Sequence, residues 1–171
     1  MEKKPVTHFI AGIIIAAVMI VYSLVLMLMD LSTNQAAGFV SYVILLAGVI
    51  YFVLQYAKAM DNTLTFGNLF SYGFKSTAIA TLILLAFQVI FFVAFPEYKD
   101  KITEMSRENM IKQGQLSEEQ IDQAMAMMQR FFWVGLIGGT VFFCLIIGAI
   151  ASLIGAGLAK KNPQTPFQNP L

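Results

Sequence analysis

Few residues in this sequence could act as a nucleophile, a general base or a metal ligand. The chain has one cysteine, Cys144, inside an apolar run, and one histidine, His8, near its start. Catalysis needs such a group held against an orienting partner, and neither residue has a candidate partner. A lone cysteine also excludes a disulfide and a zinc site built from cysteine pairs. We therefore expect no catalytic residue, no metal site and no cofactor, and predict that the protein is not an enzyme.

The acidic residues between positions 96 and 130 are the remaining candidates for chemistry. No Asp-x-Asp-x-Asp-Gly calcium loop is present, and Glu104 and Glu108 are spaced four residues apart beside Lys101 and Arg107. This spacing is typical of a solvated, charged helix face. If the protein were an enzyme, the remaining possibility would be catalysis by a pair of carboxylates at the outer face of a membrane.

One strongly polar side chain, Gln88, lies well inside an apolar run, with Thr77 and Thr81 on the same predicted helix. In a membrane it can form a hydrogen bond between helices or contact a solute. Ion-coupled transport usually leaves an ionisable residue inside a span. No Asp, Glu, Arg or His occurs at the centre of any apolar run, so a proton relay is not expected.

The composition indicates which elements position these residues. Hydrophobic residues make up 58% of the 171 residues and charged residues 12%, whereas soluble domains have about 45–50% and about 25%. Four apolar runs reach the about 20 residues that a membrane-spanning helix requires, at 8–29, 38–56, 72–95 and 131–159. We predict an all-α polytopic membrane protein, with one four-helix transmembrane domain over residues 1–171. Residues 96–130 form an extramembrane helical hairpin, and residues 160–171 a disordered tail.

Charge predicts the orientation and excludes one class of partner. A net charge of +1 without a basic cluster gives no reason to expect nucleic acid. Lys3, Lys4, Lys160 and Lys161 lie at the outer ends of the first and last spans, whereas acids outnumber the basic residues of 96–130. By the positive-inside rule both termini are cytoplasmic. The first apolar run has 22 residues, more than the about 7–15 of the apolar region of a cleaved signal peptide, so we expect a retained membrane anchor.

The segment 96–130 is predicted to form two helices. Pro96 ends the preceding span, and Ser117 begins a capping box that starts the second helix. Met125 and Met128 share an apolar stripe on that helix. The stripe either packs on the first helix or forms a docking face for a partner or hydrophobic ligand. The second helix can continue without interruption into the fourth span.

Small residues recur along the fourth run and predict close helix packing. Gly135 and Gly139 form a GxxxG motif, and Gly148, Ser152 and Gly155 follow at similar spacing. Small side chains let helix backbones approach closely. The neighbour can be another helix of this chain or a second copy in a homo-oligomer.

The connection between the second and third runs predicts an amphipathic interfacial turn. Thr65 can cap a helix on which Phe66, Phe70 and Gly73 share a face, and Gly67 lies in the same start. We regard these five residues as a candidate interaction surface.

At these positions the chain resembles the bacterial domain-of-unknown-function 4199 family of small four-span proteins. The likeness rests on the Thr65-Phe66-Gly67 start, on Phe70 and Gly73, and on the apolar run that follows. The likeness extends to the polar segment before the last apolar run, which contains Ser117-Glu118-Glu119-Gln120-Ile121. The resemblance covers the whole chain and implies a membrane location and topology, with no established activity to transfer.

Three functions follow as hypotheses. The first is a non-enzymatic accessory or assembly subunit of the bacterial inner membrane, acting through contacts with a protein partner or a second copy. A small transporter or channel component, suggested by Gln88 and its neighbouring threonines, is the alternative. A membrane-face enzyme is the lesser alternative.

Overall fold

The computed structural model describes residues 5–29, 31 and 34–160, except the side chain of Gln35. Within these residues the chain is all-helical, without strands, as predicted. The helices are α1 (His8–Leu28), α2 (Gln35–Ala59), α3 (Phe66–Ala94), α4 (Glu97–Gln113), α5 (Glu118–Arg130) and α6 (Phe132–Leu158). Apart from Lys160, the predicted disordered tail lies outside the described residues, and so do Lys3 and Lys4.

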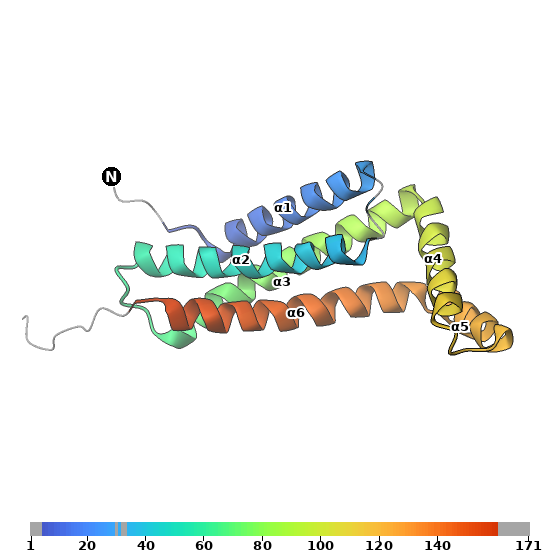
Figure 1. Cartoon of the computed structure of the whole chain (residues 1–171). Coiled ribbons are helices and arrows are strands. Elements are labelled where there is room, and N and C mark those ends of the chain that lie inside the picture. Colours follow the sequence, from blue (N-terminus) through green and yellow to red (C-terminus); the bar gives the residue numbers. More distant parts are fainter. Residues whose placement is uncertain (1–4, 30, 32–33, 161–171) are drawn as a thin grey trace, which may run out of the picture.

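Four helices, α1, α2, α3 and α6, are long and apolar enough to cross a membrane, which indicates a multi-pass membrane protein. α3 begins at Phe66, so the predicted interfacial turn is the first part of this helix. Its 29 residues extend about 43 Å, more than the about 30 Å of a hydrocarbon core. In Figure 1, α3 runs obliquely across α2 and α6, which accommodates this length.

Polar caps define where these helices begin. The side chains of Thr7, Asn34 and Thr65 each accept a hydrogen bond from a backbone N–H in the first turn that follows. Such caps satisfy donors that would otherwise lack a partner at a helix start. Between α2 and α3, Asp61 and Asn62 adopt positive φ angles of 52° and 57°, a conformation that Asp and Asn tolerate better than most residues.

The four spanning helices form a ring in the order α1, α3, α6, α2. The main packing pairs are α3 with α6, α1 with α3, and α2 with α6, while α2 and α3 also meet across the ring. Leu45, Val49 and Val53 of α2 point into the ring and are fully buried. Buried residues of α1, α3 and α6 join them, so the core lies between all four spanning helices.

The extramembrane hairpin consists of α4 and α5, packed against each other. In Figure 1, α4 runs from the end of α3 towards the start of α6 and spans the distance between them. The prediction of one uninterrupted helix through α5 and α6 is wrong, because the helix is interrupted at Phe131, where φ is −104° and ψ is 14°. This bend lets the apolar stripe of α5 bury against α4 instead of extending into water.

Candidate functional site

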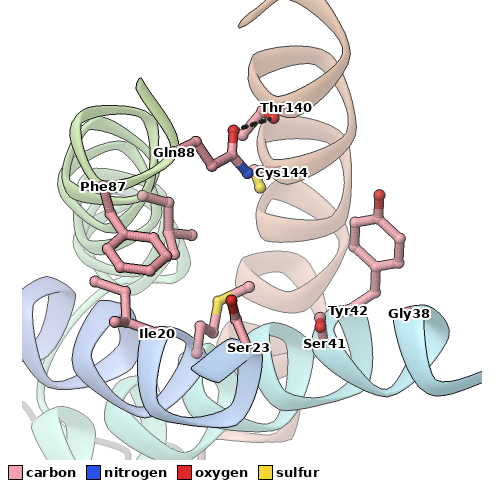
Figure 2. A pocket seen from close by; sticks show the side chains of 11 residues that line it. Ile20, Ser23, Gly38, Ser41, Tyr42, Phe87, Gln88, Thr140 and Cys144 are labelled. Carbon is pink, nitrogen blue, oxygen red and sulfur yellow. Dashed lines mark hydrogen bonds between the residues drawn. The ribbon is translucent and has the colours of Figure 1, made fainter. Parts of the chain in front are cut away.

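The four spanning helices line a partly open cavity of about 220 Å³ in the half of the bundle nearer the hairpin. Gln88 of α3 lies six residues before the end of that helix at Ala94, or about 9 Å along it. The other lining residues come from all four spans, and Figure 2 shows most of them. They are Met19, Ile20, Ser23, Gly38, Ser41, Tyr42, Leu84, Phe87, Thr140 and Cys144.

A hydrogen bond between two helices holds one wall of this cavity. The Thr140 hydroxyl of α6 donates to Oε1 of Gln88 on α3 at 2.9 Å, as drawn in Figure 2. The sequence left Gln88 as either an interhelical hydrogen bond or a solute contact. Its carbonyl oxygen forms the former, and its amide nitrogen is directed towards Cys144 at the cavity wall.

Several polar groups of the cavity have no intramolecular partner among the described residues: the hydroxyls of Ser23 and Ser41, and the amide nitrogen of Gln88. The fully buried hydroxyls elsewhere in the bundle behave differently. Each donates to the backbone carbonyl four residues earlier in its own helix. These are Ser76, Thr77, Thr81 and Ser152, at 2.8, 3.1, 2.9 and 2.6 Å. These buried hydroxyls are thus satisfied within their own helices, whereas the exposed Ser23 and the half-buried Ser41 are not.

The half of the bundle away from the hairpin is packed closely through glycines. A Cβ at Gly73 of α3 would lie 2.5 Å from Oγ of Ser152 and 2.7 Å from a methyl group of Val53. A Cβ at Gly148 of α6 would collide with the side chain of Thr77. Only glycine permits this approach of α3 to α6 and α2, so the cavity is closed on this side.

The remaining predicted packing residues of α6 divide into two groups. At Gly155 a Cβ would lie 3.0 Å from Cβ of Val53, so this glycine also meets α2. At Gly135 and Gly139 a Cβ would meet no described atom within 4 Å. The GxxxG motif therefore lies on the outer surface of the bundle.

Aromatic rings close the end of the bundle that carries the described termini. Tyr56 and Tyr72 stack with their ring centroids 4.0 Å apart, and His8 meets the edge of Tyr72 at 6.5 Å. The Tyr72 hydroxyl donates to the carbonyl oxygen of Val6 at 2.9 Å. This bond ties the segment before α1 to α3.

The candidate surface at the start of α3 is split by the helix. Thr65, Phe66 and Gly67 are exposed, whereas Gly73 is buried. Phe70 is half-buried. The five residues do not share one exposed surface.

Methionines of α5 lie mainly inside the hairpin. Met125 is buried, Met128 is half-buried, and α5 packs on α4. Arg107 of α4 and Asp122 of α5 form an ion pair of 2.8 Å across the hairpin. The stripe thus packs within the hairpin rather than forming an open docking face.

The hairpin is attached to the membrane helices by aromatic residues. The Lys99 ammonium of α4 lies over the ring of Phe132 of α6, 5.1 Å from its centroid. Phe92 of α3 meets the same ring at 5.3 Å, and Phe91 meets Tyr98 of α4 at 5.3 Å. These contacts fix α4 against the ends of both α3 and α6.

Sequence reasoning missed Ser23 and Ser41 as site residues. Both are single serines in apolar runs, which was the available signal. Their meeting with Gln88 depends on how the helices pack. Among the described residues, no group of three His, Cys, Asp or Glu side chains could hold a metal ion.

The sequence was also compared with known proteins. The model of DUF4199, described as a protein family of unknown function, matches residues 10–161. No curated protein and no solved structure matches the chain. With nearly the whole chain covered by the family model, this four-span helical protein belongs to the DUF4199 family.

Proposed function

We propose that the protein is a non-enzymatic accessory or assembly subunit of the bacterial inner membrane and that the hairpin α4–α5 contacts its protein partner. The observation that carries this proposal is the hairpin itself. It is braced against the spanning helices while Ile111 and Leu116, at its tip, remain 56% and 42% exposed. Contiguous exposed apolar patches mark interaction sites, and in this proposal Ile111 and Leu116 belong to one such patch at the tip.

The bracing supports a binding role because it reduces the cost of association. The Arg107–Asp122 ion pair joins α4 to α5, and the Lys99–Phe132 contact joins α4 to α6. A surface that is already ordered loses less conformational freedom when it binds. A partner therefore meets a preformed surface.

Charge indicates the chemistry of the partner. Residues 97–130 contain seven acidic and five basic side chains, so the hairpin is acidic. Complementary potentials steer association and select partners. We expect a membrane-associated protein that presents apolar side chains flanked by Lys or Arg.

The proposed orientation places the hairpin outside and both termini in the cytoplasm. Lys58 at the end of α2 and Lys160 after α6 lie at the end of the bundle opposite the hairpin. Basic residues near helix ends favour the cytoplasmic side. An even number of spans is consistent with both termini on one side.

Photocrosslinking at the hairpin tip tests the proposal. A photoreactive amino acid replaces Leu116 in the full-length protein, expressed in its native membrane, and the matched control replaces the lipid-facing Val93, which is 69% exposed. We expect one discrete protein adduct from Leu116 and none from Val93. The adduct should weaken when Ile111 is replaced by Ser. The proposal is contradicted if the Leu116 variant forms no protein adduct and if affinity purification in mild detergent repeatedly recovers this protein without a partner.

A small transporter or channel component is the second candidate, favoured by the cavity and its polar lining. Leu45, Val49 and Val53 are fully buried beyond the cavity, so transport would need a second conformation that opens this half. Proteoliposome permeability to small neutral solutes such as glycerol tests this function. A transporter should raise the permeability above that of empty liposomes, and Gln88→Leu should lower it.

The non-enzymatic part of the proposal is supported by the surroundings of the outer carboxylates. Asp122 pairs with Arg107, and Glu108 pairs with Lys112 at 3.4 Å. Carboxylates held by basic partners are suited to a stable charged surface. A carboxyl group that acts as a general acid near neutral pH would need an environment that favours its protonation.

A further inference from the structure

We propose that the cavity between the four spanning helices is a binding site for an uncharged amphiphile with one hydroxyl or carbonyl head group. The head group bonds to Gln88 and Ser23, and the apolar body packs on Ile20, Leu84 and Phe87. This inference concerns the membrane interior and does not rest on the hairpin contact proposed above.

The cavity has the size of a small-molecule site. Its volume is about 220 Å³, larger than the about 150 Å³ of an engineered apolar cavity that binds benzene. A ring or a short alkyl chain with a head group therefore fits. The cavity lies in the half of the bundle where α1 and α3 are farthest from α6 in Figure 1.

The polar groups are arranged for a head group that accepts hydrogen bonds. The Thr140 hydroxyl bonds to Oε1 of Gln88 and so fixes the plane of the amide. The two N–H groups of that amide have no partner among the described residues. Figure 2 shows Ser23 on α1 across the cavity from Gln88 on α3. A hydroxyl or carbonyl oxygen between them can accept from Gln88, and the Ser23 hydroxyl can add a second bond.

The unpaired groups distinguish this cavity from the rest of the bundle. Elsewhere each fully buried hydroxyl donates to a carbonyl of its own helix, as at Ser76 and Ser152. In a membrane, polar groups without a partner are costly. The hydroxyls of the exposed Ser23 and the half-buried Ser41 and the amide nitrogen of Gln88 keep their hydrogen-bonding capacity at the cavity, which suits a ligand site.

The lining also selects the charge of the ligand. No Asp, Glu, Lys, Arg or His is among the residues that line the cavity. An ion in a low-dielectric site needs an opposite charge to compensate for lost hydration. The ligand is therefore uncharged, and it is either a neutral membrane lipid or a free amphiphilic solute.

The single cysteine provides a native reporter for binding. Cys144 lines the cavity from α6, and it is the one cysteine of the chain. The experiment measures the rate at which methyl methanethiosulfonate modifies Cys144 in the purified full-length protein. The probes are octanol, octane and octanoate, which share a chain length and differ in the head group.

We expect octanol to slow the modification at lower concentration than octane, and octanoate to have no effect. Gln88→Leu keeps the size of the side chain but removes the amide. It should weaken protection by octanol about 3- to 18-fold, the range that measured interhelical hydrogen bonds imply, and leave octane unchanged. Ser23→Ala is a milder second variant with the same direction. Ile90→Leu, at a 68% exposed position on the lipid-facing side of α3, is the matched control and should behave as the wild type.

Equal protection by the three probes, or an unchanged octanol effect in both variants, overturns the proposal. A thiol that does not react in the absence of any probe also overturns it, because the cavity would then be inaccessible. Mass spectrometry of the purified protein distinguishes the two sources of ligand. A neutral lipid retained by the wild type and lost in Gln88→Leu identifies a lipid, and octanol protection without such a lipid identifies a free solute.

Discussion

Gly148 provides a direct test of the packing that closes one half of the bundle. A Cβ at this position would collide with the side chain of Thr77 and lie 2.7 Å from its Cβ. Both residues are in mid-helix and buried, so neither can move without shifting α3 or α6. Overpacking of this kind costs about 1–3 kcal/mol. The same substitution gains about 0.5–1 kcal/mol of helix propensity. For Gly148→Ala we therefore expect a net loss of about 1–2 kcal/mol in the free energy of unfolding.

Gly139→Ala is the matched control in the same helix. A Cβ at Gly139 meets no described atom within 4 Å, so only the propensity gain of about 0.5–1 kcal/mol applies. The assay is reversible unfolding of the purified protein in mixed detergent micelles, titrated with sodium dodecyl sulfate. Thr77→Ala should restore part of the stability lost in Gly148→Ala, because it removes the nearest side-chain atoms. Equal stabilities of Gly148→Ala and Gly139→Ala would refute the reasoning.

The other predictions concern the hairpin, the termini and the topology. Arg107→Asp should lower the protection of the hairpin from hydrogen exchange by about 0.2–1 kcal/mol, since its ion pair with Asp122 is exposed. The double variant with Asp122→Arg should recover this loss, and a failure to recover would contradict a specific pair. Tyr72→Phe keeps the ring but loses the bond to Val6, which should cost about 0.5–1.5 kcal/mol and speed proteolysis before α1; an unchanged cleavage rate would count against this tie. In a variant without the native cysteine, Leu116→Cys should react with a membrane-impermeant maleimide from outside intact cells, and protection until the cells are lysed would reverse the orientation.

Much of the fold could be predicted because membrane helices are encoded locally. Runs of apolar residues define the four spans, and Ser117 and Thr65 mark helix starts through caps that involve only neighbouring residues. The ends were less accurate where polar residues continue a helix beyond its apolar run. α3 thus begins at Phe66, directly after the predicted cap Thr65 and six residues before the predicted third span.

The packing of α6 illustrates what local patterns leave open. Gly139 and Gly148 are both small residues of one helix, yet one has no neighbour within 4 Å and the other faces Thr77. Spacing predicts that small residues share a face, but it does not say which part of that face meets another helix. The interruption of the helix at Phe131 also could not be predicted from local patterns. It accompanies two tertiary contacts, the packing of α5 on α4 and the ring contact of Phe132 with Phe92.

The cavity was the least predictable part. Gln88 could be recognised as unusual from its position in an apolar run, and so could Ser23. Their convergence is set by the angle at which α3 crosses the other helices in Figure 1. The contacts that let α3 approach α6 and α2 closely lie at Gly73 and Gly148, which are not among the lining residues. The site therefore depends on residues that do not line it.

The interleaved pairing of the helices has a consequence for how the protein is made. α1 packs mainly on α3, and α2 packs mainly on α6, the fourth of the four spans in chain order. α2 must therefore remain in the bilayer without its principal neighbour while about a hundred further residues are translated. A nascent chain that stops after α3 would expose the face of α2 that α6 normally covers. Quality control in the membrane could recognise such an incomplete product by that uncovered face.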